Sequence, residues 1–135
     1  MKNFKSNFLL RGEDYIIVEA DEFDKSFLKL SPDFACITSI DPDHLDIYGN
    51  KENLISAFKD FTKRISHNGF LITHENLDFA QNKYGFQSDS DYQIINYRVK
   101  EGASLFDIKF KSSFFKDILL PMIGMHNVLN ATAAI

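Results

Sequence analysis

The 135-residue chain has no tryptophan, three prolines and a single cysteine. With Cys36 alone, the sequence excludes an internal disulfide and a zinc site built from cysteines. No apolar run reaches the ~18 residues that a membrane-spanning helix needs, and the first residues lack the long apolar segment of a secretory signal. These absences predict a soluble cytoplasmic domain that makes no membrane contact, in which Cys36 is a small core residue of a strand.

A strong charge of either sign is also missing, since 15 basic and 19 acidic residues give a net charge of −4. This balance argues against nucleic acid as a partner, because binding along a phosphate backbone needs an excess of basic side chains. Apolar residues, in contrast, make up 44% of the chain and include 14 phenylalanines. That content excludes a disordered chain and predicts one folded domain with a real core.

Short apolar runs predict buried strands in the first half of the chain. They lack the alternation of a half-exposed strand, which is typical of parallel sheets that are covered on both faces. The three runs are Tyr15–Val18, Phe34–Ile40 and Phe70–Thr73. A short crossover turn or helix is expected over Lys25–Leu30, between the first two runs.

The clearest helix is expected over residues 50–66, with Asn50 as its N-cap. One apolar stripe recurs along it at helical spacing: Leu54, Phe58, Phe61 and Ile65. A second, shorter helix is expected over Glu75–Asn82.

From residue 92 the pattern becomes alternating. Tyr92–Val99 and Leu105–Phe110 flank Glu101-Gly102, which predicts an antiparallel hairpin with one wet face. Phe114–Leu120 adds a third strand, and a last helix follows Gly124. The predicted fold class is therefore α/β, a mostly parallel sheet flanked by helices plus a small antiparallel sheet.

We expect a single domain over residues 1–135, with the parallel part at 8–90, the antiparallel part at 91–121 and the last helix from 124 to 135. The chain opens a few residues before a core strand and closes inside the last helix. These two features predict a fragment of a longer protein.

Two acidic clusters follow the first two predicted strands, namely Glu19–Asp24 and Asp41–Asp46. Because the carboxyl ends of parallel strands meet at one edge of a sheet, both clusters are expected there, where carboxylates suit a hard cation. In the second cluster His44 is the candidate ligand, and an aspartate would orient it. The alternatives are a solvated acidic loop for the first cluster and a surface loop with a capping Asp43 or Asp46 for the second.

A third cluster, Gly124–Asn130, places His126, Asn127 and Asn130 on one face of the last helix. Asparagine carries a donor and an acceptor side by side, which suits the edge of an adenine ring. The alternative is that Asn127 only caps the helix. The sequence contains no GxxxxGK[ST] phosphate loop and no legible Ser-His-Asp arrangement.

In this order and spacing, the three clusters resemble the central ATP-binding domain of the Mur ligases. The resemblance rests on Val18–Leu28, Ile37–Gly49 and Gly124–Ala131. It implies a P-loop NTPase-like domain that lacks its first strand and phosphate loop. For the alanine-adding branch, it implies an ATP-dependent, Mg²⁺-dependent ligase that joins UDP-N-acetylmuramate to L-alanine through an acyl phosphate, in cytoplasmic peptidoglycan synthesis.

The resemblance also implies roles for five residues. Glu19 would coordinate the magnesium that bridges the ATP phosphates, and His44 would hold a second magnesium near the acyl phosphate, so both are candidate catalytic residues. His126, Asn127 and Asn130 would contact the adenine. Without a phosphate loop, the isolated chain is expected to be inactive, and its open sheet edge is expected to favour a dimer.

Two other functions stay open at this point. A different Mur ligase branch, such as one that recycles a murein tripeptide, would share the acidic strand end. A non-catalytic binding module on the same scaffold would show neither a magnesium effect nor a preference for adenine.

Overall fold

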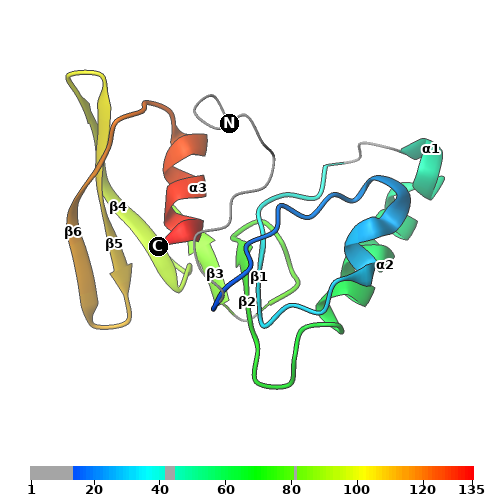
Figure 1. Cartoon of the computed structure of the whole chain (residues 1–135). Coiled ribbons are helices and arrows are strands. Elements are labelled where there is room, and N and C mark those ends of the chain that lie inside the picture. Colours follow the sequence, from blue (N-terminus) through cyan, green and yellow to red (C-terminus); the bar gives the residue numbers. More distant parts are fainter. Residues whose placement is uncertain (1–13, 42–44, 81) are drawn as a thin grey trace.

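The structure is a computed structural model that describes residues 14–41, 45–80 and 82–135 (Figure 1). The described residues form one six-stranded sheet in the order β1-β2-β3-β4-β5-β6. The strands are β1 (Phe34–Ile37), β2 (Phe70–His74), β3 (Asn82–Gly85), β4 (Tyr92–Lys100), β5 (Ala103–Phe110) and β6 (Ser113–Leu120). The helical segments are the 3₁₀ segment η1 (Phe23–Lys29) and the α-helices α1 (Leu45–Tyr48), α2 (Lys51–Thr62) and α3 (Met125–Ala134).

The sheet is mixed, and this confirms the predicted α/β class. The pairs β1–β2, β2–β3 and β3–β4 are parallel, whereas the pairs β4–β5 and β5–β6 are antiparallel. The antiparallel strands do not form a sheet of their own, because β3 pairs with β4 through Tyr84 and Tyr92. None of the described helices has the length and apolar character needed to cross a membrane.

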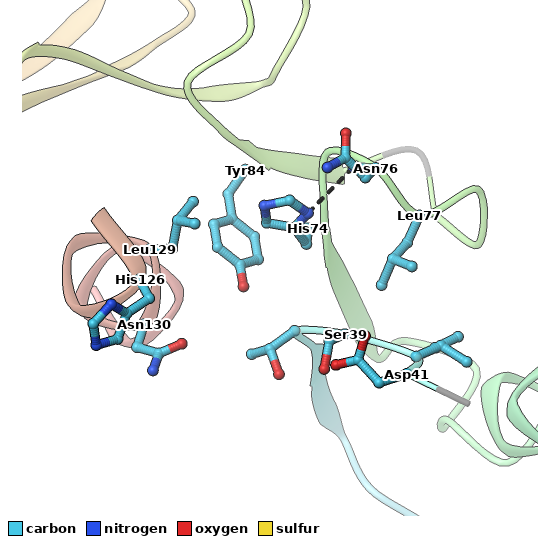
Figure 2. Close-up of a pocket in the computed structure, with 11 residues that line it drawn as sticks. Ser39, Asp41, His74, Asn76, Leu77, Tyr84, His126, Leu129 and Asn130 are labelled. Atoms are coloured by element: carbon cyan, nitrogen blue, oxygen red, sulfur yellow. Dashed lines mark hydrogen bonds between the residues drawn. The ribbon is translucent and has the colours of Figure 1, made fainter. Parts of the chain in front are cut away.

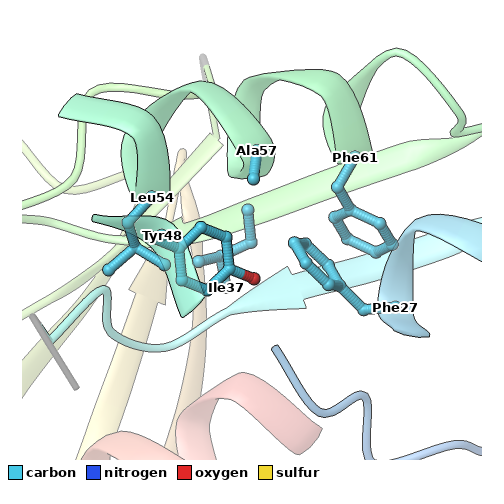
Figure 3. Packing of buried hydrophobic residues seen from close by; sticks show 6 residues of the cluster. All are labelled: Phe27, Ile37, Tyr48, Leu54, Ala57 and Phe61. Carbon is cyan, nitrogen blue, oxygen red and sulfur yellow. The ribbon is translucent and has the colours of Figure 1, made fainter. Parts of the chain in front are cut away.

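Helix α2 covers one face of the parallel strands, and its predicted N-cap is confirmed, whereas the helix ends at Thr62 and so leaves Ile65 of the predicted stripe outside it. The Asn50 side-chain oxygen accepts a hydrogen bond from the Asn53 N–H at 2.8 Å, so Asn50 is the N-cap. Leu54 and Phe61 are buried against η1 and β1, where Phe27 and other side chains complete the core (Figure 3). This core fixes the position of β1 relative to the rest of the sheet.

Helix α3 lies on the opposite face. Ile37 of β1 belongs to the core under α2 and pairs with Thr73 of β2, so both side chains point to the α2 face of the sheet. The next residue of β2, His74, points to the opposite face, because successive side chains of a strand alternate. Tyr84 of β3 pairs with His74 and therefore also lies on the face away from α2. There Val128 of α3 joins a second core with residues of β4 and β5, namely Ile94, Phe106 and Ile108.

The strand predicted at Tyr15–Val18 is wrong. These residues are in no described strand, and their side chains are 84%, 87%, 98% and 55% exposed in chain order. An apolar run becomes a strand only when a neighbour satisfies its backbone groups. In the described sheet β1 is an edge strand, paired with β2 alone. The predicted dimer through this open edge stays a prediction.

The helix predicted at Glu75–Asn82 is also wrong, because residues 82–85 form β3 and turns precede it. The Glu75 carboxylate accepts hydrogen bonds from the Gln87 N–H at 2.7 Å and from the Ser90 hydroxyl at 3.0 Å. It lies so close to Gly85 that a Cβ there would be 1.8 Å from its Oε2 atom. These long-range contacts hold β3 in the sheet and outweigh the local helical preference.

The predicted hairpin is confirmed, with Glu101-Gly102 in left-handed conformation at φ of 50° and 79°. Both outer strands bulge near Asp107 of β5, a buried carboxylate. Its two oxygens accept hydrogen bonds from the Asn96 amide at 2.7 Å and from the Asp117 N–H at 2.8 Å. Asp107 therefore satisfies the Asp117 N–H in the bulged part of β6 and also binds the Asn96 side chain in the bulged part of β4.

We expect Asp107→Asn to change how stability depends on pH. The hydrogen bond from Asn96 and that from the Asp117 N–H hold the pKa of Asp107 below its usual value. A lowered folded-state pKa gives stability that is present above about pH 4 and is lost as the pH falls through the folded value. The variant should therefore have a lower urea midpoint of unfolding at pH 7, and the difference from the parent should shrink at pH 2.5.

The measurement is the urea midpoint of both proteins at several pH values. Asp89→Asn, at an exposed carboxylate in the loop after β3, is the matched control and should leave the midpoint at pH 7 unchanged. A constant difference between Asp107→Asn and the parent from pH 7 to pH 2.5 would contradict this role of the carboxylate.

Candidate functional site

A cleft of about 540 Å³ opens at the carboxyl ends of β1 and β2 (Figure 2). It is lined by residues 38–41 after β1, by His74 and two residues of the turn after β2, by Tyr84 of β3 and by three residues of α3. Ligands of open α/β sheets bind at this kind of edge, outside the carboxyl ends of parallel strands. The cleft is therefore the candidate functional site.

The side of the cleft formed by α3 contains two of the predicted adenine-contacting residues. His126, Leu129 and Asn130 line the cleft, since residues three and four apart share one helix face. Asn127 does not line it, because its side-chain amide donates to the Ile123 carbonyl at 2.7 Å. Asn127 thus fastens the loop before α3, and the N-cap itself is Gly124, at a φ of 112°.

The other side of the cleft follows β1. Figure 2 shows Ser39 and Asp41 across the cleft from His126 and Asn130. Asp41 is the one described residue of the second acidic cluster that lines the cleft, whereas Asp46 lies in α1 and is exposed. The structure thus brings part of the second predicted cluster and part of the third to one edge of the sheet.

Sequence reasoning missed two aromatic residues of the cleft, His74 and Tyr84. The His74 ring meets the Tyr84 ring edge-on, at 5.7 Å between centroids, and its Nδ1 atom accepts a hydrogen bond from the Asn76 N–H at 3.3 Å. In the neutral ring this leaves the proton on Nε2. His74 is half-buried in β2, an interior strand of the sheet that pairs with β3.

Tyr84 is fully buried, and its hydroxyl has no oxygen or nitrogen partner among the described residues. Burial raises the pKa of Tyr84, and the neighbouring Cys36 thiol, through its charge and a weak hydrogen bond, raises it further. Partial desolvation of the thiol raises the pKa of Cys36, although its hydrogen bond with Tyr84 lowers it in part. The prediction that Cys36 is a core residue is wrong, since it is an exposed residue on the edge strand β1, beyond the region that α3 covers.

The first acidic cluster lies outside the lining of the cleft. Glu19 is exposed, and two of its neighbours make local turns. The Asp21 carboxylate accepts a hydrogen bond from the Phe23 N–H at 2.9 Å, and the Asp24 carboxylate accepts one from the Ser26 N–H at 3.0 Å. These two carboxylates shape the entry to η1.

Tyr48 of α1 links the two acidic regions. It is buried, and its hydroxyl donates to the Glu22 carbonyl at 2.5 Å. Burial raises the pKa of Tyr48, and the nearby carboxylates of Glu22, Asp21 and Asp24 add to the effect. This hydrogen bond places α1, which contains Asp46 of the second cluster, beside the first cluster, although the strand from which the position of the first cluster was predicted is not formed.

The candidate metal ligand His44 lies outside the described residues, as do Pro42 and Asp43. Within residues 14–41, 45–80 and 82–135, no group of three or more His, Cys, Asp or Glu side chains is placed to hold a metal ion. Mg²⁺ usually keeps several waters and takes one or two carboxylates together with substrate phosphates. The described carboxylates therefore form no all-protein cage for a cation.

Comparison with known proteins identifies the family. The model of the Mur ligase middle domain matches residues 3–135, so the chain belongs to this family. A curated relative, the UDP-N-acetylmuramate–L-alanine ligase of Christiangramia forsetii, is 41% identical over 134 residues. The match covers 99% of this chain but 30% of the relative, so the chain spans less than a third of that protein's length.

Solved structures show the same fold. The UDP-N-acetylmuramate-alanine ligase of Thermotoga maritima has a TM-score of 0.69 at 23% identity, over 81% of this chain and 26% of that one. The MurF ligase of Thermotoga maritima in complex with ADP has a TM-score of 0.62 at 17% identity, over 82% of this chain and 28% of that one. Both confirm the mixed sheet with flanking helices.

Proposed function

We propose that this chain is the nucleotide-binding middle domain of an ATP-dependent ligase that joins L-alanine to UDP-N-acetylmuramate, forming the amide through an acyl phosphate, in cytoplasmic peptidoglycan synthesis. The observation that carries the proposal is the cleft, where α3 presents His126 and Asn130 opposite Ser39 and Asp41. L-Alanine and UDP-N-acetylmuramate come from the name of the relative that is 41% identical.

The cleft suits a nucleotide in size and chemistry. Its volume of about 540 Å³ lies within the range of small-molecule sites, about 300–1,000 Å³. The Asn130 amide offers a donor and an acceptor to the edge of adenine, with His126 beside it and Leu129 as an apolar contact. Asn127 stays in the proposed set, but with its amide nitrogen held by the Ile123 carbonyl it offers a ligand only its side-chain oxygen.

Glu19 and His44 are the proposed magnesium ligands and catalytic residues. A bound Mg²⁺ would neutralise charge on the transferring phosphoryl oxygens. The carboxylates of Asp21 and Asp24, in the same acidic cluster, accept backbone hydrogen bonds, which favours a glutamate of that cluster, Glu19 or Glu22, as the cation ligand. Asp41 lies at the cleft edge, where it can orient water around a cation that is shared with phosphate.

The proposal predicts that His126→Ala combined with Asn130→Ala weakens binding of Mg²⁺-ATP about tenfold or more. Two hydrogen-bonding side chains are removed from one side of the cleft, and each is worth about 0.5–1.5 kcal/mol. The measurement is a titration followed by amide-resolved NMR, in which the parent chain should show shifts around the cleft.

The matched control is His67→Ala combined with Asn68→Ala, which removes the same two residue types from an exposed turn outside the cleft. It should bind Mg²⁺-ATP as the parent does. Equal affinities for the parent and for the cleft variant would refute the assignment of this side of the cleft to adenine.

A further inference from the structure

The Tyr84 hydroxyl is a polar group for which the described residues supply no oxygen or nitrogen partner. The residue is 0% exposed, and the contact its oxygen makes is with the Cys36 side chain. A thiol is only a weak hydrogen-bond partner, so this contact leaves the hydroxyl poorly satisfied. Leaving a hydroxyl buried and unpaired costs about 1–3 kcal/mol, so a buried tyrosine normally has a partner for its O–H group.

Three buried hydroxyls lack a partner in the described residues, and Tyr84 is the one that lines the cleft. The other two belong to Thr73 and Ser104, which lie away from it. Figure 2 shows the Tyr84 hydroxyl pointing into the space between Asn130 and Ser39. A ligand in that space would lie within reach of this group.

We propose that Tyr84 is a ligand-binding residue whose hydroxyl donates a hydrogen bond to the nucleoside part of the nucleotide in the cleft. This inference rests on the proposed function, since it takes the occupant to be a nucleotide. The neighbouring α3 residues His126 and Asn130 are the proposed adenine contacts, so the nucleoside is the part of the ligand that lies closest to Tyr84. Adenine ring nitrogens and ribose oxygens are the acceptors that a phenol can reach there.

Two features prepare Tyr84 for this role. The edge-on contact with His74, whose own ring is held by the Asn76 N–H, fixes the position of the phenol ring before a ligand arrives. The hydroxyl is protonated at neutral pH, as in any tyrosine whose pKa is not lowered, so it is available as a donor. A group that is already buried and oriented loses little entropy when the ligand binds.

The test compares Tyr84→Phe with Thr73→Val in the 135-residue chain, by thermal unfolding without ligand and by NMR titration with adenosine and with Mg²⁺-ATP. Tyr84→Phe should raise the unfolding temperature, because it removes an unpaired hydroxyl. It should also weaken both adenosine and Mg²⁺-ATP by the same factor, about five- to tenfold. Thr73→Val removes an equally buried hydroxyl outside the cleft, so it should raise the unfolding temperature and leave both affinities unchanged.

Three results would overturn the inference while the proposed function stands. Tyr84→Phe could lower the unfolding temperature, which would mean that the hydroxyl is bonded within the protein. It could bind both ligands as the parent does, which would mean that the hydroxyl meets no ligand. It could lose affinity for Mg²⁺-ATP alone, which would place the contact on the phosphates. A parent chain that binds neither ligand would overturn both the inference and the proposed function.

Discussion

Replacing Leu54 by alanine is expected to lower the free energy of unfolding by about 2–5 kcal/mol. Leu54 is 0% exposed and lies beside Tyr48 in the core that α2 forms with η1 and β1 (Figure 3). Truncation removes its apolar contacts and leaves a cavity that the rigid neighbours fill only in part. Domains of this size have a total stability of about 5–15 kcal/mol, so the loss is a large fraction of the whole.

Urea unfolding followed by circular dichroism measures this change. Leu119→Ala is the matched control, because it makes the same truncation on β6 at a side chain that is 63% exposed. Its effect should stay within about 0.5 kcal/mol. A loss below about 1 kcal/mol for Leu54→Ala would show that this core is not packed as described.

The second large effect concerns turnover. The 135-residue chain by itself is expected to show no ligase activity with ATP, Mg²⁺, UDP-N-acetylmuramate and L-alanine. Its sequence contains no GxxxxGK[ST] loop, whose backbone N–H groups and lysine would hold the phosphates. Each missing charge-assisted contact is worth about 1.5–3 kcal/mol, so the loss of several such contacts lowers phosphate affinity by orders of magnitude.

Release of phosphate is the readout, and the full-length Christiangramia forsetii relative in the same assay is the positive control. The isolated chain should give only background release, even at nucleotide concentrations where the NMR titration detects binding. Turnover above background would show that these residues alone position the phosphates.

Elements with a complete local signal could be predicted from the sequence. Helix α2 has both an N-cap, Asn50, and an apolar stripe, and the structure shows the cap bond and the buried stripe. The hairpin of β4 and β5 has alternation on both strands and a turn that contains Gly102. In these cases residues within a few positions of one another determine the conformation.

Elements that depend on distant partners could not be predicted. Tyr15–Val18 has the composition of a strand but no neighbour in the described sheet. Strand β3 has four residues, too few to show a period, and it is held by the side chain of Glu75 against Gly85 and by pairing with β2 and β4.

The same distinction applies to the candidate site. His126 and Asn130 could be found because helical spacing puts them on one face, and both line the cleft. Tyr84 and His74 reach the cleft from two neighbouring strands, and no period in the sequence shows that these strands pair. Their place in the cleft could therefore not be predicted from the sequence. The absence of hydrogen-bond partners for a buried hydroxyl is visible only in three dimensions.

The packing of α3 has a consequence for substitutions far from the cleft. Val128 lies on Ile94 and Phe106, while residues of the same helix line the cleft. Among the described residues, none that lines the cleft comes from β5 or β6, yet side chains of both strands pack in the core beneath the helix. Phe106 thus lies beneath the helix, and we expect a change in its volume to shift α3 and alter the width of a cleft that Phe106 itself does not line.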